Sequence, residues 1–463
     1  MCQADQIEYE FVVDGVALSR CRACTLLFAN PPAARSAAPP VPAEMLAALG
    51  ALRDLAAAYR GSTAQSVLMV DGGGAPQLPG ADTVRPDDVD RSRRYDLVIA
   101  YDAVERDPNP LELLDTLRGV VAPGGALLFA TPSLASPAAR RARETWPALR
   151  SKAAWWFTCD TAQLLLTRAG FGDFITFNEA RDAGGGADPA LRTFFDANIA
   201  LLARPVTPPQ RRVLSVIVPV FNEVRTVAQL LDFVVAKEID GVDIEIVVVE
   251  SNSTDGSRDV CARYADHPRV RLVLEERPRG KGAAVRAGLE HATGEVILFQ
   301  DADLEYDVSD YDRLVDPLFA LRRNFVLGSR HGATGDGWKI RRFEKRRVFS
   351  SAMNLAHLAL NTLFNRLYRQ RLFDPFTMYK VFRRDCLYGL EFECNRFDFD
   401  IEIAAKLFRK GYQPVEIPVN YRSRSFSEGK KVEFFADPPT WVKAMLRVRA
   451  EPLYRLSDPK PKT

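Results

Sequence analysis

The stretch "GEVILFQDADLEYD", residues 294–307, decides how the second half of this chain folds. Its apolar run over 296–299 lies between a glycine and a polar cluster, a pattern typical of a buried strand. Asp301 and Asp303 follow this strand directly. Two carboxylates at a strand end repel each other and resist desolvation unless a positive charge lies between them. They are therefore either solvated loop charges or ligands of a divalent cation.

Three more predicted strands in this half end in polar clusters. "LSVIVPV" leads into "FNE", "DIEIVVVE" into "SNSTDGS", and "VRLVLEE" into "RPRGKGAAVRAGL". The strands alternate with helical stretches such as "VAQLLDFVVAK", which predicts an α/β domain with a mainly parallel sheet. Ligands of open α/β sheets bind beyond the carboxyl ends of the strands. The four clusters are therefore predicted to converge on one crevice.

The first half shows the same alternation, with strands such as "YDLVIAYD" and "GGALLFATP" around the helical "PLELLDTLRGVVA". A chain of 463 residues is too long for one ordinary core. The proline-rich stretch "LLARPVTPPQRRVLSVIVPVFNE" marks the boundary. We expect one domain over 1–205, a linker over 206–212 and a second domain over 213–463, both α/β.

The composition, with 47% hydrophobic residues, is that of a globular protein. The formal net charge of +2 gives no reason to expect a nucleic-acid partner. No apolar run approaches the roughly 18–20 residues of a membrane span, and "MCQADQIEYEF" lacks signal-peptide features. Seven scattered cysteines do not form a disulfide framework. A cytoplasmic protein is expected. A structural zinc site needs four ligands, and Cys21 and Cys24 have only Cys2 upstream, so we expect a vestigial pair without zinc.

The stretches "YDLVIAYDAVERDPNPLELLDTLRGVVAPGGALLFATPS" and "FTCDTAQLLLTRAGF" resemble the late strands of class I S-adenosylmethionine-dependent methyltransferases, over roughly residues 1–205. The resemblance implies a Rossmann-like, methyltransferase-type fold. At the cofactor loop, however, Met69 stands at the acidic position, and Asp71 and Ala75 replace the outer glycines around the run Gly72, Gly73 and Gly74.

The spacing after this loop also departs from the family. About twenty residues separate the loop from the next apolar strand, whereas a crossover helix and strand need about thirty. We expect the helix and strand that carry the ribose-binding carboxylate to be missing, since no apolar strand precedes Asp87, Asp88 or Asp90. A degenerate domain that does not bind S-adenosylmethionine is predicted.

The clusters of the second half closely resemble the family 2 glycosyltransferases, nearest to the polyprenyl-phosphate (dolichol-phosphate) mannosyl- and glucosyltransferases, over roughly residues 213–440. The resemblance implies a nucleotide-diphospho-sugar transferase (GT-A) fold. It also implies inverting, metal-dependent transfer of a hexose from a nucleotide-diphosphate sugar to a phosphate-bearing acceptor such as polyprenyl phosphate. The implied donor-binding residues are Pro219, Asn222, Glu223, Glu250, Asn252, Asp255, Lys281 and Asp301. Glu250 and Ser251 stand where the family commonly has two aspartates, so the nucleobase stays open.

Asp301 and Asp303 correspond to the family's metal-binding Asp-x-Asp motif and are predicted to be catalytic. Mg²⁺ or Mn²⁺ takes oxygen ligands and neutralises the negative charge that develops on the leaving diphosphate. By resemblance Asp303 is the direct ligand, and the division of roles between the two stays open.

Acceptor-binding residues are also carried over from the family. Arg330 follows a Gly-Ser, and Arg346 and Ser350 are predicted to share a helix face where they hold a phosphate. Arg424 and Lys430 lie in "YRSRSFSEGKKV", which resembles a phosphate-binding loop of the branch. The alternative for the basic residues is a solvated face.

Two more segments match family patterns. "LFDPFTMYKVFRRD" has the Asp-x-x-Ser/Thr pattern at Asp374 and Thr377, and "NRFDFDIEIAAKLFRKGY" supplies Asp400. Asp400 is predicted to be the base if the acceptor is a hydroxyl, whereas an anionic phosphate acceptor needs none. Asp398 competes for this role, and a helix N-cap is the alternative for either. His357 is expected in the core or at an interface.

Several alternatives stay open. The C-terminal "FFADPPTWVKAMLRVRAEPLYRLSDPKPKT" forms an amphipathic helix that either lies on the inner membrane face or packs on its own domain. The acceptor is a lipid phosphate or a small soluble hydroxyl compound. A bifunctional enzyme with a live methyltransferase, a homo-oligomer and a non-catalytic assembly protein are further alternatives.

Overall fold

The computed structural model describes residues 6–31, 41–61, 63–71, 78–151, 153–184, 186, 188–331, 347–423 and 437–454. Contacts divide the chain into two compact units. The first comprises residues 1–208 with 410–412 and 452–463, and the second comprises 209–409 with 413–451. No helix in the described ranges combines the length and the apolarity that crossing a membrane requires.

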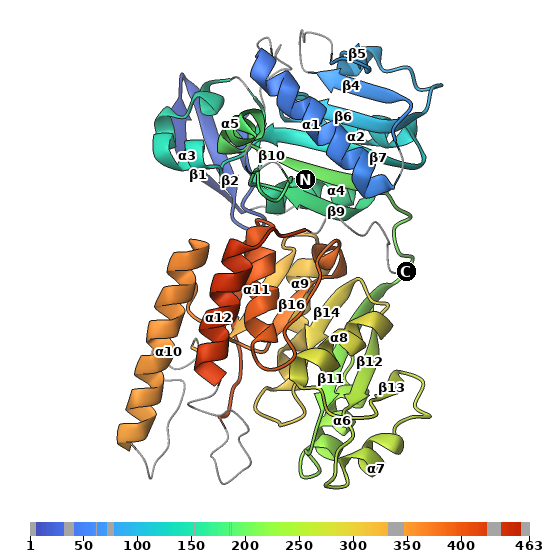
Figure 1. The fold of residues 1–463 in the computed structure, drawn as a ribbon, viewed down its shortest axis with the longest axis vertical. Helices are drawn as coiled ribbons and strands as arrows, with labels where there is room; N and C mark the ends of the chain where they lie inside the picture. The colour runs from blue at the N-terminus through green and yellow to red at the C-terminus, as the bar shows by residue number, and fades with distance from the viewer. Residues whose placement is uncertain are drawn as a thin grey trace. The chain divides into compact units, whose positions relative to one another are not determined.

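The N-terminal unit contains two sheets (Figure 1). The smaller is antiparallel, in the order β1 (Ile7–Val13), β2 (Val16–Cys21), β3 (Leu27–Ala29) and β8 (Trp155–Trp156). The larger has the order β5 (Asp82–Val84), β4 (Val67–Asp71), β6 (Tyr95–Tyr101), β7 (Val121–Pro132), β10 (Asn198–Pro205) and β9 (Phe171–Phe177). The helices are α1 (Ala43–Arg60), α2 (Pro110–Val120), α3 (Pro137–Ala142), α4 (Cys159–Arg168) and α5 (Pro189–Ala197).

One expectation about this unit is wrong. A second strand does follow the cofactor-loop region, because β5 pairs in parallel with β4 through Leu68 and Asp82. The strand has only three residues, two of them polar and none buried, so its hydrophobic signal is too weak to recognise in the sequence. No helix is described between β4 and β5.

The C-terminal unit is built on a seven-stranded sheet in the order β13 (Val270–Leu274), β12 (Val242–Glu250), β11 (Arg212–Val220), β14 (Val296–Phe299), β16 (Lys380–Arg383), β15 (Phe325–Ser329) and β17 (Val415–Pro418). Strands β13, β12, β11 and β14 pair in parallel. Strand β16 is antiparallel to both of its neighbours, and β17 is parallel to β15. The predicted α/β fold class is confirmed in both units.

The helices of this unit are α6 (Val227–Ala236), α7 (Ser257–Ala262), α8 (Lys281–His291), α9 (Tyr311–Phe319), α10 (Arg347–Tyr368), α11 (Phe399–Arg409) and α12 (Asp437–Ala450). Helices α10, α11 and α12 lie side by side and contact one another (Figure 1). Helix α8 packs tightly on the sheet, since a Cβ at Gly288 would lie 2.4 Å from Ile217 Cγ2. Lys281, the first residue of α8, lies beside Asp301, which follows the end of β14.

Candidate active site

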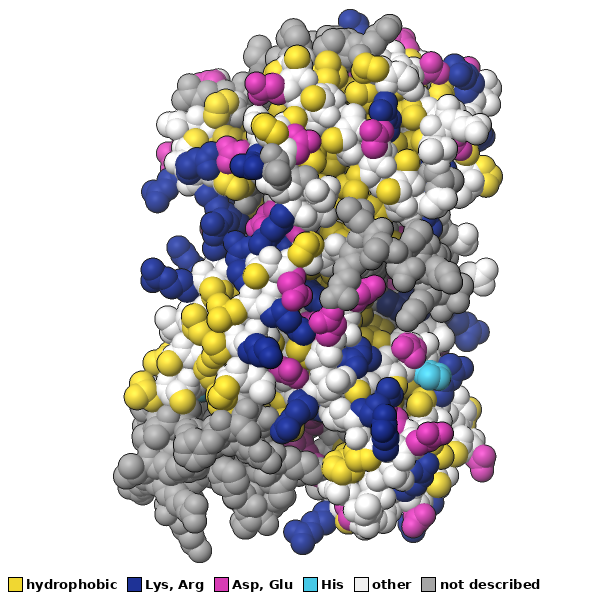
Figure 2. Space-filling view, viewed as in Figure 1, with side chains coloured by type: hydrophobic (Ala, Val, Ile, Leu, Met, Phe, Trp, Pro, Cys, Tyr) yellow, Lys and Arg dark blue, Asp and Glu magenta, His cyan; other side chains and the backbone are white. Residues whose placement is uncertain are grey.

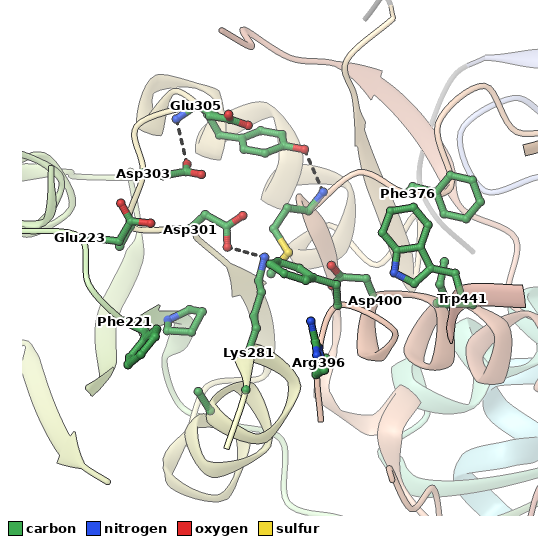
Figure 3. Close-up of a pocket in the computed structure, with 18 of the residues that line it drawn as sticks. Phe221, Glu223, Lys281, Asp301, Asp303, Glu305, Phe376, Arg396, Asp400 and Trp441 are labelled. Atoms are coloured by element: carbon green, nitrogen blue, oxygen red, sulfur yellow. Dashed lines mark hydrogen bonds and ion pairs between the residues drawn. The ribbon is translucent and has the colours of Figure 1, made fainter. Parts of the chain in front are cut away.

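A cavity of about 470 Å³ lies in the C-terminal unit, beyond the carboxyl ends of β11 and β14. One part of its wall carries the charged residues Glu223, Lys281, Asp301, Asp303, Arg330, Arg396 and Asp400. The other part is mostly apolar and aromatic, with Ala356, His357, Leu360, Phe376, Met378, Pro438 and Trp441. Figure 3 shows Asp400 between the carboxylates of the β14 end and the rings of Phe376 and Trp441. Charged and apolar side chains therefore line the same cavity.

The aspartates after β14 face a lysine from α8. The Nζ atom of Lys281 lies 2.6 Å from Oδ1 of Asp301 (Figure 3). Oδ1 of Asp303 accepts a hydrogen bond of 3.1 Å from the backbone N–H of Glu305. Burial alone would lower the pKa of Lys281, but the charges of Asp301, Asp400 and Asp303 outweigh burial and raise it. The lysine therefore stays protonated among three carboxylates.

The residues at this end of the cavity fit a divalent cation. Asp301, Asp303 and Asp400 all line the cavity and offer only oxygen atoms, which Mg²⁺ and Mn²⁺ prefer. Oδ1 of Asp400 is buried, and no hydrogen bond reaches it from any residue that the structure describes. A buried carboxylate oxygen of this kind needs a cation or a donor from a ligand.

The structure separates the two aspartates that compete for the role of base. Asp400 lies in the first turn of α11 and lines the cavity. Asp398 is not among the residues described as lining the cavity, and its Oδ1 accepts a 3.1 Å hydrogen bond from the backbone N–H of Arg396. Of the two, only Asp400 is among the residues described as lining the cavity, and its role as a base stays a prediction.

Of the predicted donor-binding residues, Pro219, Glu223, Lys281 and Asp301 line the cavity. The other four are not among its described lining. Asn222 lies in the loop after β11, Asn252 and Asp255 lie in the loop after β12, and Glu250 is the last residue of β12.

Hydrogen bonds join these two loops. Asn222 Oδ1 accepts from Thr254 N–H at 2.9 Å, and Asp255 Oδ2 accepts from Val224 N–H at 3.0 Å. At the end of β12, Glu250 Oε1 accepts from the N–H of Ser253, in the second loop, at 2.7 Å. These side chains therefore shape the rim of the site by holding backbone amides.

Arg330 follows β15 and lines the cavity, where it forms a buried ion pair. Its Nε and Nη2 atoms lie 2.7 and 2.6 Å from the two oxygens of Asp374, whose side chain is fully buried. Burial alone would raise the pKa of Asp374, but the Arg330 guanidinium holds it well below its usual range. The guanidinium also lies 5.4 Å from the ring centre of Tyr421. Arg330 is thereby held rigidly in the cavity wall.

The sequence did not indicate a cluster beside this pair. Ligand atoms of His331, His357 and Asp374 lie within 4.8 Å of one another, a spacing that could hold a metal ion. Both oxygens of Asp374 already accept hydrogen bonds from Arg330, so a cation there would face the guanidinium. We assign no metal to this cluster. His357, expected in the core or at an interface, lines the cavity.

Most of the aromatic wall carries no signal in the sequence. Phe376 and Trp441 stack with ring centres 6.5 Å apart, although 65 residues separate them in the chain. Their one sequence signal was the amphipathic pattern around Trp441.

Several predicted residues lie outside the described part of the chain: Cys2, Gly72, Gly73, Gly74, Arg346, Arg424 and Lys430. Ser350 lies in α10, but its side chain is not described. Cys21 and Cys24 are both buried. The expected absence of zinc and of S-adenosylmethionine stays a prediction.

In the N-terminal unit, buried acids lie at the end of β4 and after the end of β6. Asp71, Asp102 and Glu105 are 2%, 8% and 3% exposed. Thr131 Oγ1 donates a hydrogen bond to Oε1 of Glu105, and no described residue donates one to Oε2. Burial, with a smaller contribution from the charge of Asp102, raises the pKa of Glu105 from 4.5 to about 8. This side chain therefore binds its proton more tightly in the folded than in the unfolded chain.

Glu105→Gln is expected to stabilise the N-terminal unit at alkaline pH. Because the folded-state pKa is raised, the wild type should lose stability as pH rises from about 4.5 to about 8. At pH 8 the variant should gain roughly 2–4 kcal/mol in free energy of unfolding, since one pKa unit is worth about 1.36 kcal/mol. Urea denaturation at pH 5 and 8, followed by tryptophan fluorescence, would measure it, because Trp146, Trp155 and Trp156 belong to this unit. Glu112→Gln, at an exposed position on α2, is the control. An unchanged pH slope in Glu105→Gln would contradict the assignment.

Comparisons with known proteins match two different families to segments in the two units of the chain. The family model for glycosyl transferase family 2 matches residues 215–388, and a model for a methyltransferase domain matches residues 34–173. The undecaprenyl-phosphate 4-deoxy-4-formamido-L-arabinose transferase of Enterobacter sp. (strain 638) is 30% identical over 220 residues, which is 47% of this chain and 62% of that protein. The protein of the same name from Sodalis glossinidius (strain morsitans) is 28% identical, over 48% of this chain and 64% of its own length. The chain thus spans less than two thirds of these relatives.

Among solved structures, glucosyl-3-phosphoglycerate synthase from Mycobacterium tuberculosis, in complex with Mg²⁺ and uridine diphosphate, is 21% identical. The match covers 51% of this chain and 79% of that chain, with a TM-score of 0.37. Mannosyl-3-phosphoglycerate synthase from Rubrobacter xylanophilus is 18% identical over 51% of this chain and 72% of its own, with a TM-score of 0.39.

Proposed function

We propose that this chain transfers a hexose from a nucleotide-diphosphate sugar to a polyprenyl phosphate. The model for glycosyl transferase family 2 matches residues 215–388, and the model for a methyltransferase domain matches residues 34–173. One observation carries the proposal: a single cavity joins the carboxylates at the strand ends to an aromatic and aliphatic wall. A donor diphosphate with its metal suits the first part, and an apolar acceptor chain suits the second.

On the donor side, Asp301 and Asp303 would hold Mg²⁺ or Mn²⁺, which neutralises the negative charge that develops on the diphosphate. Pro219 and Glu223 line the same part of the cavity, so the nucleoside would lie along the end of β11. The bridged loops after β11 and β12 form a preorganised rim, since their amides are already held by Asn222 and Asp255. Preorganised polar groups of this kind lower the cost of binding charge.

On the acceptor side, a polyprenyl phosphate needs a cation for its head group and an apolar surface for its chain. Arg330 supplies a rigid guanidinium with five N–H donors. Two of these donors, on Nε and Nη2, bind the oxygens of Asp374. The wall around Phe376 and Trp441 supplies the apolar surface. Figure 2 shows hydrophobic side chains gathered over α10, where Leu355 and Leu358 are 65% and 47% exposed. An apolar chain longer than the cavity would therefore meet further apolar surface outside it.

With a phosphate acceptor, the nucleophile is an anionic oxygen that needs no base. This oxygen attacks the anomeric carbon while the bond to the donor diphosphate breaks on the opposite face, which inverts the configuration. Asp400, beside Lys281 in the cavity, would then orient the sugar or the metal shell rather than remove a proton.

The position of Asp400 supports a second candidate, transfer to a soluble hydroxyl acceptor. Its buried Oδ1 receives no hydrogen bond from the described residues, which suits a base that takes a proton from a hydroxyl. The apolar wall would then bind the acceptor's carbon skeleton.

A transfer assay on the whole protein tests the proposal and separates the two acceptors. Mn²⁺ and a panel of radiolabelled nucleotide-diphosphate sugars would be combined with undecaprenyl phosphate in detergent or with 3-phosphoglycerate in water. Label that moves into the organic phase, with at most a modest loss in Asp400→Asn, is the result expected for a lipid phosphate. Transfer only to 3-phosphoglycerate, lost in Asp400→Asn, would select the hydroxyl acceptor. If no sugar nucleotide binds or reacts, the proposal is wrong.

Trp441→Ala is expected to weaken binding of a long-chain acceptor. The indole lies in the apolar wall and stacks on Phe376, and losing such an aromatic contact costs about 1.4 kcal/mol, or roughly tenfold in affinity. The KM for undecaprenyl phosphate should rise by roughly this factor, whereas the KM for the donor should not change. Leu446→Ala, on the same helix but 52% exposed, is the matched control. An equal rise in both KM values would contradict the assignment.

A further inference from the structure

Lys281 occupies the position that a metal ion bound to Asp301 would need. Its Nζ lies 2.6 Å from Oδ1 of Asp301, one of the two proposed metal ligands, and the two side chains are 18% and 21% exposed. Figure 3 shows the lysine reaching from α8 toward Asp301, with Asp303 and Asp400 nearby. One ammonium group thus stands among three carboxylates at the place proposed for the cation.

The backbone that carries Lys281 cannot move away easily. A Cβ at Gly280 would lie 2.4 Å from the carbonyl oxygen of Asn395, and a Cβ at Gly282 would lie 2.5 Å from Cβ of Phe399. Both flanking glycines are therefore packed against the segment that leads into α11. Any movement of the ammonium group must come from the lysine side chain, which has a flexible four-carbon stem.

The ammonium group of Lys281 and a divalent metal ion cannot both bind Asp301 at the same time. An ammonium group and a divalent ion on the same carboxylate repel each other strongly in a partly buried site. A metal bound through Asp301 therefore requires Lys281 to leave. The released ammonium needs a new anionic partner, and the diphosphate of the donor is the anion that the proposed function brings to this cavity.

We infer that Lys281 is a placeholder cation, which holds Asp301 when no metal is bound and moves to the diphosphate when the metal and the donor enter together. The inference rests on the proposed metal site. Binding of the metal and of the diphosphate then becomes cooperative. The metal displaces Lys281 from Asp301, and the diphosphate supplies the anion that the displaced lysine needs. Free metal ions then bind weakly, and the site is completed only in the presence of the donor.

The test measures Mn²⁺ binding by electron paramagnetic resonance, without any turnover, in the whole protein. Lys281→Met should bind free Mn²⁺ at least tenfold more tightly than the wild type, because the competing cation is gone. The same variant should bind the 1:1 complex of Mn²⁺ with inorganic pyrophosphate at least tenfold more weakly, because the ammonium no longer contacts the diphosphate. Changes in opposite directions are not the result of a general loss of structure.

Lys237→Met is the matched control. Lys237 also pairs with an aspartate, Asp312, and is 18% exposed in its side chain, but it is not among the described residues that line the cavity. Its two affinities should equal those of the wild type. Lys281→Gln, which keeps the polar end of the side chain without its charge, should behave as Lys281→Met does and serves if the methionine variant does not fold.

The outcomes separate this inference from the proposed function. Unchanged or weaker binding of free Mn²⁺ in both Lys281 variants overturns the placeholder role. Tighter binding that Asp303→Asn does not abolish places the ion elsewhere, which overturns the proposed metal site itself. Tighter binding that Asp303→Asn abolishes supports both.

Discussion

Asp303→Asn should lower the rate of sugar transfer by a factor on the order of 10² to 10³, with little change in stability. The substitution keeps the shape of the side chain and removes the charge that would hold the metal beside the donor diphosphate. Its Oδ1 accepts a hydrogen bond from the backbone N–H of Glu305, and the amide oxygen of asparagine can accept the same bond. The turn after β14 should therefore persist while the chemistry is lost.

Two measurements on the same protein samples would check this prediction. Single-turnover transfer rates at saturating Mn²⁺ report the chemical step, and thermal denaturation reports the fold. Asp316→Asn, on α9 and with its carboxylate 68% exposed, is the control that changes the same charge away from the cavity. Full transfer activity in Asp303→Asn would show that this carboxylate is not part of the metal site.

The second large effect concerns stability. Arg330→Met should lower the free energy of unfolding of the C-terminal unit by about 3–5 kcal/mol, because it leaves the carboxylate of Asp374 buried without its counter-charge. The two hydrogen bonds that the guanidinium donates to Asp374, at 2.6 and 2.7 Å, are lost, whereas the 2.9 Å bond from the backbone N–H of residue 330 can remain. The contact of the guanidinium with the ring of Tyr421 is lost as well.

The effect should depend on pH. In the wild type, Arg330 holds the folded-state pKa of Asp374 below its usual value of 3.8, so the pair contributes its full stability above that value and loses it only as pH falls through the lower, folded-state pKa. In the variant, burial without the guanidinium raises the pKa of Asp374, so the buried carboxyl takes up a proton as pH falls and the variant regains stability. We therefore expect the difference between wild type and variant to be smaller at pH 5 than at pH 7. A difference that grows as pH falls from 7 to 5 would contradict this assignment.

Two controls make the stability prediction specific. Arg211→Met removes an exposed pair with Asp243 in the same unit, 81% and 58% exposed, and should cost less than about 1 kcal/mol. The double variant Arg330→Met with Asp374→Leu removes both buried charges and should recover most of the lost stability, while transfer stays impaired. Equal losses in the single and the double variant would mean that packing, rather than charge, explains the effect.

Local sequence patterns were sufficient to predict which strand ends carry residues of the candidate site. Apolar runs of strand length, each ending in polar residues, predicted that Asp301, Lys281 and Glu223 would converge, and all three line one cavity. This inference works because the carboxyl ends of parallel strands meet at one edge of a sheet. Where the local signal was weak it failed, as for the short and partly polar strand β5.

The sequence by itself therefore determined the α/β class of both halves and the strand ends that carry the chemistry, because periodicity and strand-end polarity are properties of neighbouring residues. Only the tertiary structure decided the pairings: Lys281 with Asp301, Arg330 with Asp374, and the stacking of Phe376 on Trp441. These partners are 20, 44 and 65 residues apart in the chain. Which side chains meet over such separations depends on how whole helices and strands pack, and no local pattern contains that information.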